Sequence, residues 1–231
     1  MIKHLTNIFR KIMRYSLALA ILLIFSIACG GGGGGGGGSS EPSVTTFDIR
    51  PKTENITWSF TGSDTNSSSY TGQIVSSVGS TTTFSGNSVI PYTGVTTITN
   101  TTTSVSSSST GITYWSTDRL TILGINLITS GFNYLPVGSL TPLPTSADVG
   151  DSGTIGTYQN DTDSSDTVVA SWTLTQATPS TAYFTVLYVY SDGIQSSSKI
   201  TIDSSNDLTS RQEVIYYPSV PTTVTLNGTP I

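Results

Sequence analysis

Histidine and cysteine are almost missing from this sequence of 231 residues. The one histidine is His4 and the one cysteine is Cys29, so no residue after position 29 offers an imidazole or a thiolate. That part of the chain therefore excludes a Ser-His-Asp triad, a Cys-His pair and any metal site that needs histidine or thiolate ligands. A single cysteine also excludes an internal disulfide, so an apolar core must stabilise the folded part. We predict a protein that is not an enzyme and that has no cofactor beyond an attached lipid or calcium.

Charge is also scarce, at 10% of the chain, and positive charge is the scarcer sign. The sequence has 9 Lys and Arg against 14 Asp and Glu. Four of the basic residues precede position 15, and removal of that segment leaves 5 basic against 14 acidic side chains, a net charge near −9. Such a chain is not expected to bind nucleic acid through its phosphates or to be drawn to anionic headgroups by charge.

The first hydrophobic run has the layout of an export signal. Leu17 to Cys29 is apolar, basic residues precede it, and no acidic residue occurs before Glu41. Fourteen residues lie between Arg14 and Cys29. As a helix they would reach roughly 21 Å, against a hydrocarbon core of about 30 Å, which is short for a permanent span.

The end of this run, Ser26-Ile27-Ala28-Cys29, resembles the lipobox of bacterial lipoproteins. It departs from the usual pattern at Ser26, where leucine is commonest. The resemblance implies cleavage between Ala28 and Cys29, a diacylated sulfur on Cys29 and an acylated new amino group. Two or three acyl chains would hold the protein stably on a bilayer. The alternative is an ordinary cleavage site of small residues, with Cys29 an incidental free thiol.

Residue 30 bears on the destination of such a lipoprotein. It is glycine, whereas in the enterobacterial pathway an aspartate after the cysteine favours retention in the inner membrane. The resemblance therefore points to the outer membrane and leaves open whether the protein faces the periplasm or the exterior. Gly30 to Gly38 is an unbroken glycine run, which is similar to the tethers of some surface-displayed lipoproteins. From Gly30 to about Thr46 such a coil would span roughly 23 Å.

These features predict three parts of the chain: a signal peptide at 1–28, an acylated cysteine with a Gly/Ser-rich tether at 29–46, and a single β domain at 47–231. A Pro- and Gly-rich crossing near 131–153 divides the domain into two possible halves. Ser, Thr, Gly, Asn, Val, Ile and Tyr dominate past the tether, which is a β composition. No window from Val44 onward shows apolar residues at helical spacing with caps.

Alternation of apolar and polar residues marks the strands. Ile56, Trp58 and Phe60 alternate strictly, which places three large side chains on one face. Ala182 to Tyr190 is the most apolar stretch after the signal, and both of its faces are expected to be covered, so we predict a central strand. Asn227-Gly228 is expected to form a last turn. The other expected strands lie at 70–77, 81–85, 94–104, 111–117, 120–129, 166–175, 194–202, 211–217 and 222–226.

Roughly ten to twelve short strands joined by tight turns predict an all-β fold: an antiparallel sandwich, a barrel or a strongly curved half-barrel. The meander with its long crossing is somewhat similar to the curved sheets of lipoprotein and lipid carriers of the bacterial envelope. No family beyond the lipobox is identified.

One acidic turn offers a candidate metal site. Asp161, Asp163 and Asp166 are hard oxygen ligands at close spacing, which calcium requires. The EF-hand pattern fails, because the sixth position lacks glycine and the twelfth lacks glutamate. The competing interpretation is a solvated hairpin loop in an acidic protein. No other metal site is expected.

Two functions follow as hypotheses. The first is an outer-membrane-anchored lipoprotein whose non-catalytic β domain binds or scaffolds an apolar ligand or an envelope protein. The second is a calcium-dependent adhesin or a carbohydrate-binding surface lipoprotein. Paired carboxylates could hydrolyse glycosidic bonds, but every acid after the tether except Glu54, Asp118 and Glu213 falls in a loop-like stretch. Tyrosine and tryptophan could line a sugar or lipid groove, although core packing explains them first.

Overall fold

The structure, a computed structural model, describes residues 44–205 and 207–231. These residues form fifteen strands, which confirms the all-β prediction. None of them forms a helix long and apolar enough to cross a bilayer. The predicted cleavage site at Ala28 and Cys29, with its lipid attachment, lies outside the described residues.

Twelve of the strands close into an antiparallel barrel. In order around the ring, β2 pairs with β15, the strands β15 to β10 follow one another, β10 pairs with β8, and β8 leads through β7, β6 and β5 to β3, which returns to β2. The pairing of β3 with β5 bypasses β4 and completes the ring. The barrel strands are β2 (Ile56–Asp64), β3 (Ser69–Val78), β5 (Asn87–Asn100), β6 (Val105–Ser116), β7 (Ile122–Leu127), β8 (Phe132–Val137), β10 (Ser152–Asn160), β11 (Asp163–Thr178), β12 (Thr181–Tyr190), β13 (Gln195–Asp203), β14 (Leu208–Tyr217) and β15 (Thr222–Pro230).

Three short strands are attached to this ring. β4 (Thr82–Phe84) forms a hairpin with the start of β5, and β1 (Thr46–Asp48) pairs with β9 (Ser146–Asp148) as a separate two-stranded sheet. Phe47 and Ala147, from β1 and β9, are buried in the same apolar cluster as the barrel interior. The small sheet therefore extends the core.

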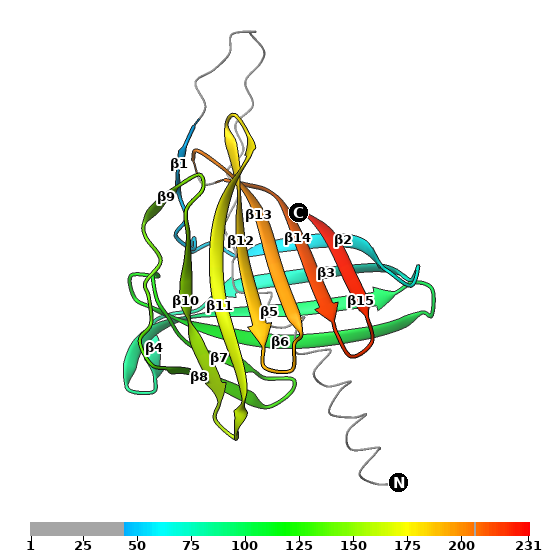
Figure 1. Ribbon diagram of the computed structural model, residues 1–231, viewed down its shortest axis with the longest axis horizontal. Coiled ribbons are helices and arrows are strands. Elements are labelled where there is room, and N and C mark those ends of the chain that lie inside the picture. Colours follow the sequence, from blue (N-terminus) through cyan, green and yellow to red (C-terminus); the bar gives the residue numbers. More distant parts are fainter. Residues whose placement is uncertain (1–43, 206) are drawn as a thin grey trace.

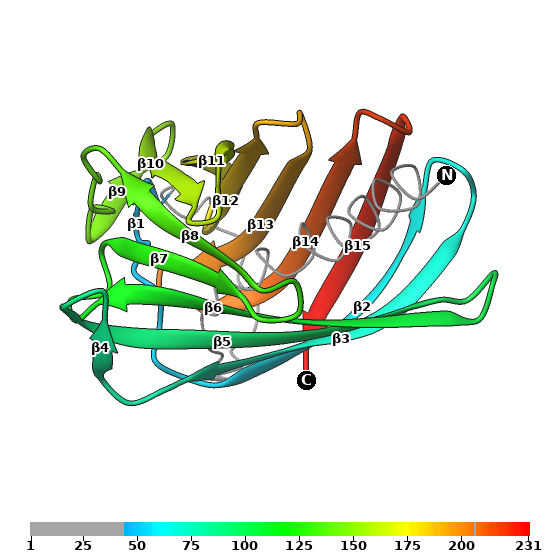
Figure 2. The same ribbon diagram turned by 90° about the horizontal axis from the view of Figure 1, so that it is seen from below.

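The barrel is flattened into two layers. Figure 1 shows β11 to β15 running side by side, with β2, β3, β5 and β6 crossing behind them at a steep angle. Figure 2, seen from below, shows the same two groups facing each other, with β7 and β8 continuing the lower layer. The barrel thus packs much as an orthogonal sandwich does.

Side chains fill the space between the layers, because each barrel strand points alternate residues inward. On β12 the inward residues are Ala182, Phe184, Val186, Tyr188 and Tyr190, all buried. The largest fully buried side chains come from strands all around the ring: Trp58, Trp115, Arg211, Tyr134, Tyr158, Tyr188, Phe60 and Phe184. The interior is therefore a packed core.

Several details differ from the sequence-based expectations. Asn227 and Gly228 lie inside β15, so the turn expected there is wrong. Only one face of β12 is buried, because Tyr183 and Leu187 are half-exposed and Val189 is exposed. The crossing at 131–153 contains strands that were not expected there: β8 and the start of β10 belong to the barrel, and β9 belongs to the small sheet. Pro136 in β8 and Gly153 and Gly156 in β10 interrupt the alternation that would have indicated these two strands, and β9 has only three residues.

Glycines on two strands are covered by aromatic rings from the neighbouring strand. A Cβ added to Gly228 would lie 2.6 Å from a ring carbon of Phe60, its partner on β2. A Cβ on Gly153 would lie 2.8 Å from Nε1 of Trp172, its partner on β11. These contacts let a large ring lie flat against the backbone, which fixes the local register.

We therefore expect Gly228→Ala to destabilise the barrel by about 1–3 kcal/mol, because the Phe60 ring must shift away from the added methyl group. Urea unfolding of the purified chain measures this change. Thr229→Ala, at the exposed next position, is the matched control and should cost less than about 1 kcal/mol. Equal midpoints for the two variants would contradict the close contact.

Candidate functional site

The acidic turn between β10 and β11 is the first candidate, since the sequence predicts calcium there. Asp166 is buried, and its Oδ2 accepts hydrogen bonds from the Tyr134 hydroxyl at 2.8 Å and from Asn160 Nδ2 at 3.1 Å. Asp161 is exposed and accepts a hydrogen bond from Asn133 Nδ2 at 3.1 Å. The carboxylate of Asp166 thus serves to pair two buried polar groups of the barrel interior.

Asp163 is engaged separately from both of these. Its Oδ1 accepts hydrogen bonds from the amide of Ser165 at 3.0 Å and from the Ser165 hydroxyl at 2.6 Å, which closes the turn. The hydrogen bonds described here thus join the three carboxylates to different groups. In the part of the chain that the structure describes, no group of three or more His, Cys, Asp and Glu side chains is placed to hold a metal ion.

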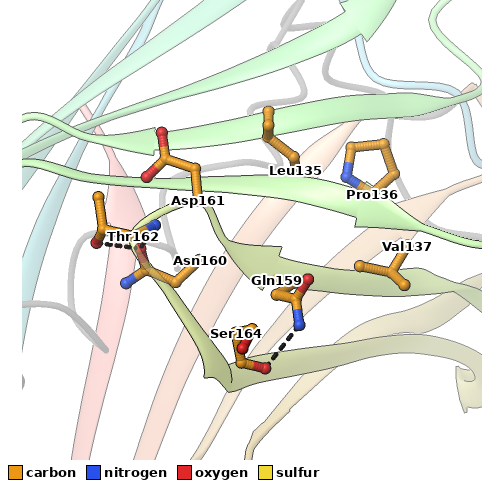
Figure 3. Close-up of a pocket in the computed structure, with 8 residues that line it drawn as sticks. All are labelled: Leu135, Pro136, Val137, Gln159, Asn160, Asp161, Thr162 and Ser164. Atoms are coloured by element: carbon orange, nitrogen blue, oxygen red, sulfur yellow. Dashed lines mark hydrogen bonds between the residues drawn. The ribbon is translucent and has the colours of Figure 1, made fainter.

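A groove of about 390 Å³ lies beside this hairpin, between β8 and the end of β10. Figure 3 shows Leu135, Pro136 and Val137 forming its apolar side, with Gln159 and Ser164 hydrogen-bonded to each other on the other side. Asp161 is the one acid among its lining residues. Of the three carboxylates considered for calcium, the structure thus brings that of Asp161 to this groove.

A buried ion pair lies within the barrel. Arg211 and Glu213 both point inward from β14 and are 1% and 0% exposed. Arg211 Nε donates to Glu213 Oε1, and the Ser198 hydroxyl donates to the same oxygen at 2.9 Å. The guanidinium also lies 5.8 Å from the centre of the Trp58 ring. Glu213 Oε2 has no hydrogen-bond partner, so the pair is incompletely satisfied.

Burial dominates the protonation of this glutamate. Desolvation raises the pKa of Glu213 to about 7, although the charge of Arg211 and the hydrogen bonds from Arg211 and Ser198 favour the ionised form. The neighbouring Tyr188 hydroxyl is also fully buried without a partner, and burial raises its pKa far above the ordinary value. Both groups face the packed interior, where no substrate has access, so we assign the pair a structural role.

The second groove, of about 480 Å³, lies on the outer face of the barrel and crosses five strands. Apart from Arg211 and Gly228, which are buried, its residues alternate with the buried ones along β12, β13, β14, β15 and β2. The same alternation that fills the core therefore also builds most of this surface. Polar side chains dominate it, and none of its residues is acidic. The lining consists of Ser59, Thr61, Tyr183, Lys199, Thr201, Ser210, Arg211, Gln212, Asn227, Gly228 and Thr229.

Strand register holds these side chains in rows. Lys199, Gln212, Asn227 and Thr61 are successive partners across β13, β14, β15 and β2. Gln212 Nε2 donates to Asn227 Oδ1 at 2.9 Å, a bond between neighbouring strands that orients both amides. The groove is thus a preformed surface of hydroxyl and amide groups.

A second row supplies the aromatic member of the groove. Tyr183, Thr201 and Ser210 are partners across β12, β13 and β14, and the Thr201 and Ser210 hydroxyls lie 2.7 Å apart. Lys199 Nζ lies 4.8 Å from the centre of the Tyr183 ring. Sequence reasoning considered tyrosines for a groove in general but singled out none. The signal in the sequence that could have identified Tyr183 is the alternation along its strand, which places this side chain on the outward face.

The pKa of Glu213 gives a testable pH dependence. An unfolded glutamate titrates near 4.5, so between about pH 4.5 and 7 the folded chain keeps a proton that the unfolded chain releases. The free energy of unfolding should therefore fall as the pH rises through this window and should level off above about pH 7. Glu213→Gln removes this contribution, so the stability of the wild type relative to the variant should drop by an amount on the order of 1–3 kcal/mol.

Urea unfolding of both proteins at a series of pH values measures that difference. Because the other carboxyl groups are common to both proteins, their titration cancels. Parallel stability curves from pH 4.5 to 8 would contradict the raised pKa.

Comparison of the chain with models of protein families, with curated proteins and with solved structures finds no match. The function must therefore be inferred from the geometry of the chain itself.

Proposed function

We propose that this protein is a lipid-anchored protein of the bacterial outer membrane whose barrel binds a carbohydrate in the outer-face groove. One observation carries the proposal: hydroxyl and amide side chains from β13, β14, β15 and β2 line a groove with the half-exposed Tyr183 ring of β12, and no acidic residue is among the lining residues. Sugars present hydroxyl groups that both donate and accept hydrogen bonds. Ser, Thr, Asn and Gln offer the same two capacities.

Tyr183 adds the apolar component that sugar binding requires. Aromatic rings bury apolar C–H surface while their polar ends stay in water, which suits a ligand with both kinds of surface. The lysine next to the ring has a long flexible stem and can move aside when a ligand approaches. The groove therefore offers both a stacking surface and hydrogen-bonding groups.

The packed interior favours the outer face over the lumen as the ligand site. An apolar ligand carried inside would have to displace side chains such as Trp58, Tyr134 and Phe184, each 0–1% exposed. Loss of that packing would cost several kcal/mol for each large side chain moved. We therefore prefer the carbohydrate hypothesis to the apolar-carrier hypothesis.

The anchor part of the proposal rests on the sequence around Cys29. Acyl chains on that sulfur and a glycine tether would place the barrel close to a membrane with freedom to turn its groove toward a ligand. Metabolic labelling with an alkyne fatty acid tests this directly. Label should enter the wild-type protein and should be lost in Cys29→Ser; a label that persists in the variant, or no label in the wild type, would overturn the anchor.

The groove is tested with the full chain purified in detergent and screened against a set of neutral and acidic oligosaccharides. Tyr183→Ala should weaken the best ligand about tenfold, because a stacked aromatic contact contributes about 0.5–1.5 kcal/mol beyond its buried area. Calorimetry measures the affinity, and repetition with a chelator reports any dependence on calcium.

Tyr216→Ala is the matched control, since Tyr216 is 38% exposed on the outward side of β14 and does not line the groove. The Tyr216→Ala variant should bind the same oligosaccharide with the affinity of the wild type. Absence of binding to every oligosaccharide, or equal losses in both variants, would count against a carbohydrate site in this groove.

A further inference from the structure

The basic side chains of the barrel domain are few, and four of the five already have partners. Arg50 is paired with Asp48, Lys52 with Asp207, and Arg211 with Glu213. Arg119 donates to the carbonyl oxygen of Pro51. In residues 44–205 and 207–231, Lys199 is the exception, because its ammonium contacts only the ring of Tyr183.

Lys199 also lies in the part of the barrel wall that forms the proposed ligand groove. It lies in the middle of β13, on the outward face and half-buried in the groove. Along the barrel strands, the acidic residues are either buried or near the strand ends and turns, as for Asp192 and Asp203. Among the described residues, Lys199 is thus the basic side chain with neither a carboxylate nor a carbonyl partner, and it lies in the groove.

The groups around this ammonium are suited to the rest of a sugar. Gln212 and Thr201 lie beside it on the neighbouring strand and on the same strand, and both are neutral. The guanidinium-bearing Arg211 also borders the groove, although its side chain points inward. No carboxylate lines the groove, so a ligand anion placed there meets no repulsion at short range.

We propose that the groove selects anionic carbohydrates, with the carboxylate of a uronic acid unit bound to Lys199 Nζ. This inference rests on the proposed carbohydrate-binding function and specifies its ligand class. The ammonium forms a charge-assisted hydrogen bond to the carboxylate, while neutral side chains of the groove bind the ring hydroxyls. The acidic groups at the strand ends repel a polyanion elsewhere on the barrel, so attraction is confined to the groove.

The test compares an oligogalacturonate with the same oligosaccharide after its carboxylates are reduced to primary alcohols. The full chain should bind the acidic form at least about tenfold more tightly, since a hydrogen bond to a charged group is worth more than a neutral one. Raising the salt concentration from about 0.05 M to 0.5 M should reduce this preference, because screening weakens exposed charge pairs.

Lys199→Gln should abolish the preference, so that this variant binds the acidic and the reduced oligosaccharide with affinities within about twofold of each other. Lys199→Arg should keep most of it, because the charge is retained. Lys52→Gln is the matched control: it also removes one positive charge, but Lys52 is paired with Asp207 and does not line the groove. The control should bind as the wild type does, and circular dichroism and thermal melting should show that all variants are folded.

The outcomes separate this inference from the proposed function. Equal binding of acidic and reduced forms, or a preference unchanged in Lys199→Gln, overturns the anionic ligand while carbohydrate binding stands. Equal losses in Lys199→Gln and Lys52→Gln also overturn it, because they indicate an effect of net charge alone. Failure of both forms and of every other oligosaccharide to bind overturns both proposals.

Discussion

The pairing of β2 with β15 is the constraint on which the rest of the structure depends. Seven residue pairs, from Asp64–Val224 to Trp58–Pro230, join the first strand of the barrel to the last. Without this seam the sheet would have two open edges, each a row of unpaired backbone groups available to other chains. With it, and with the pairing of β3 and β5, the interior is enclosed and no barrel strand remains at an edge.

The seam also creates the outer groove. Ser59 and Thr61 come from β2, and Asn227 and Thr229 from β15, so the groove lies across the closure itself. Apart from Gly228 of β15, its other members lie on β12 to β14, on the opposite side of the seam from β2. A site made of residues about 170 positions apart thus depends on register, because a slip of one residue would turn these side chains inward.

Much of the fold could be predicted from the sequence, because alternation is a local signal. Ile56, Trp58 and Phe60 are buried as expected, and the strands at 182–190 and 194–202 occur close to the predicted bounds. Prediction failed where breakers interrupt the pattern: Pro136 lies in β8, Pro91 lies in β5, and Gly228 lies in β15. The register pairs Pro91 and Pro136 with a neighbouring strand on one side only, where a missing N–H is tolerated, and the Phe60 ring covers Gly228; both are tertiary effects.

The groove was less predictable than the strands. Each of its residues is an ordinary outward side chain on its own strand, and no local motif connects them. Lys199 stands in an alternating segment and Tyr183 in an apolar one, but only the ring topology brings β2 to the same surface. The acidic turn at 160–166 differs, since its close spacing is a local signal; in the structure, Asp161, Asp163 and Asp166 accept hydrogen bonds from Asn133, Ser165 and Tyr134.

Closure of the ring by its terminal strands has a kinetic consequence. During synthesis from the N-terminal end, β15 is the last strand to be made. The other hairpins can form before it, but β2 cannot pair with β15 and close the barrel until the whole chain is present. Loop closure over so long a separation is entropically costly and slow, as in other proteins dominated by distant contacts. Closure between β2 and β15 is therefore expected to be the slow, late step of folding, after the local hairpins have formed.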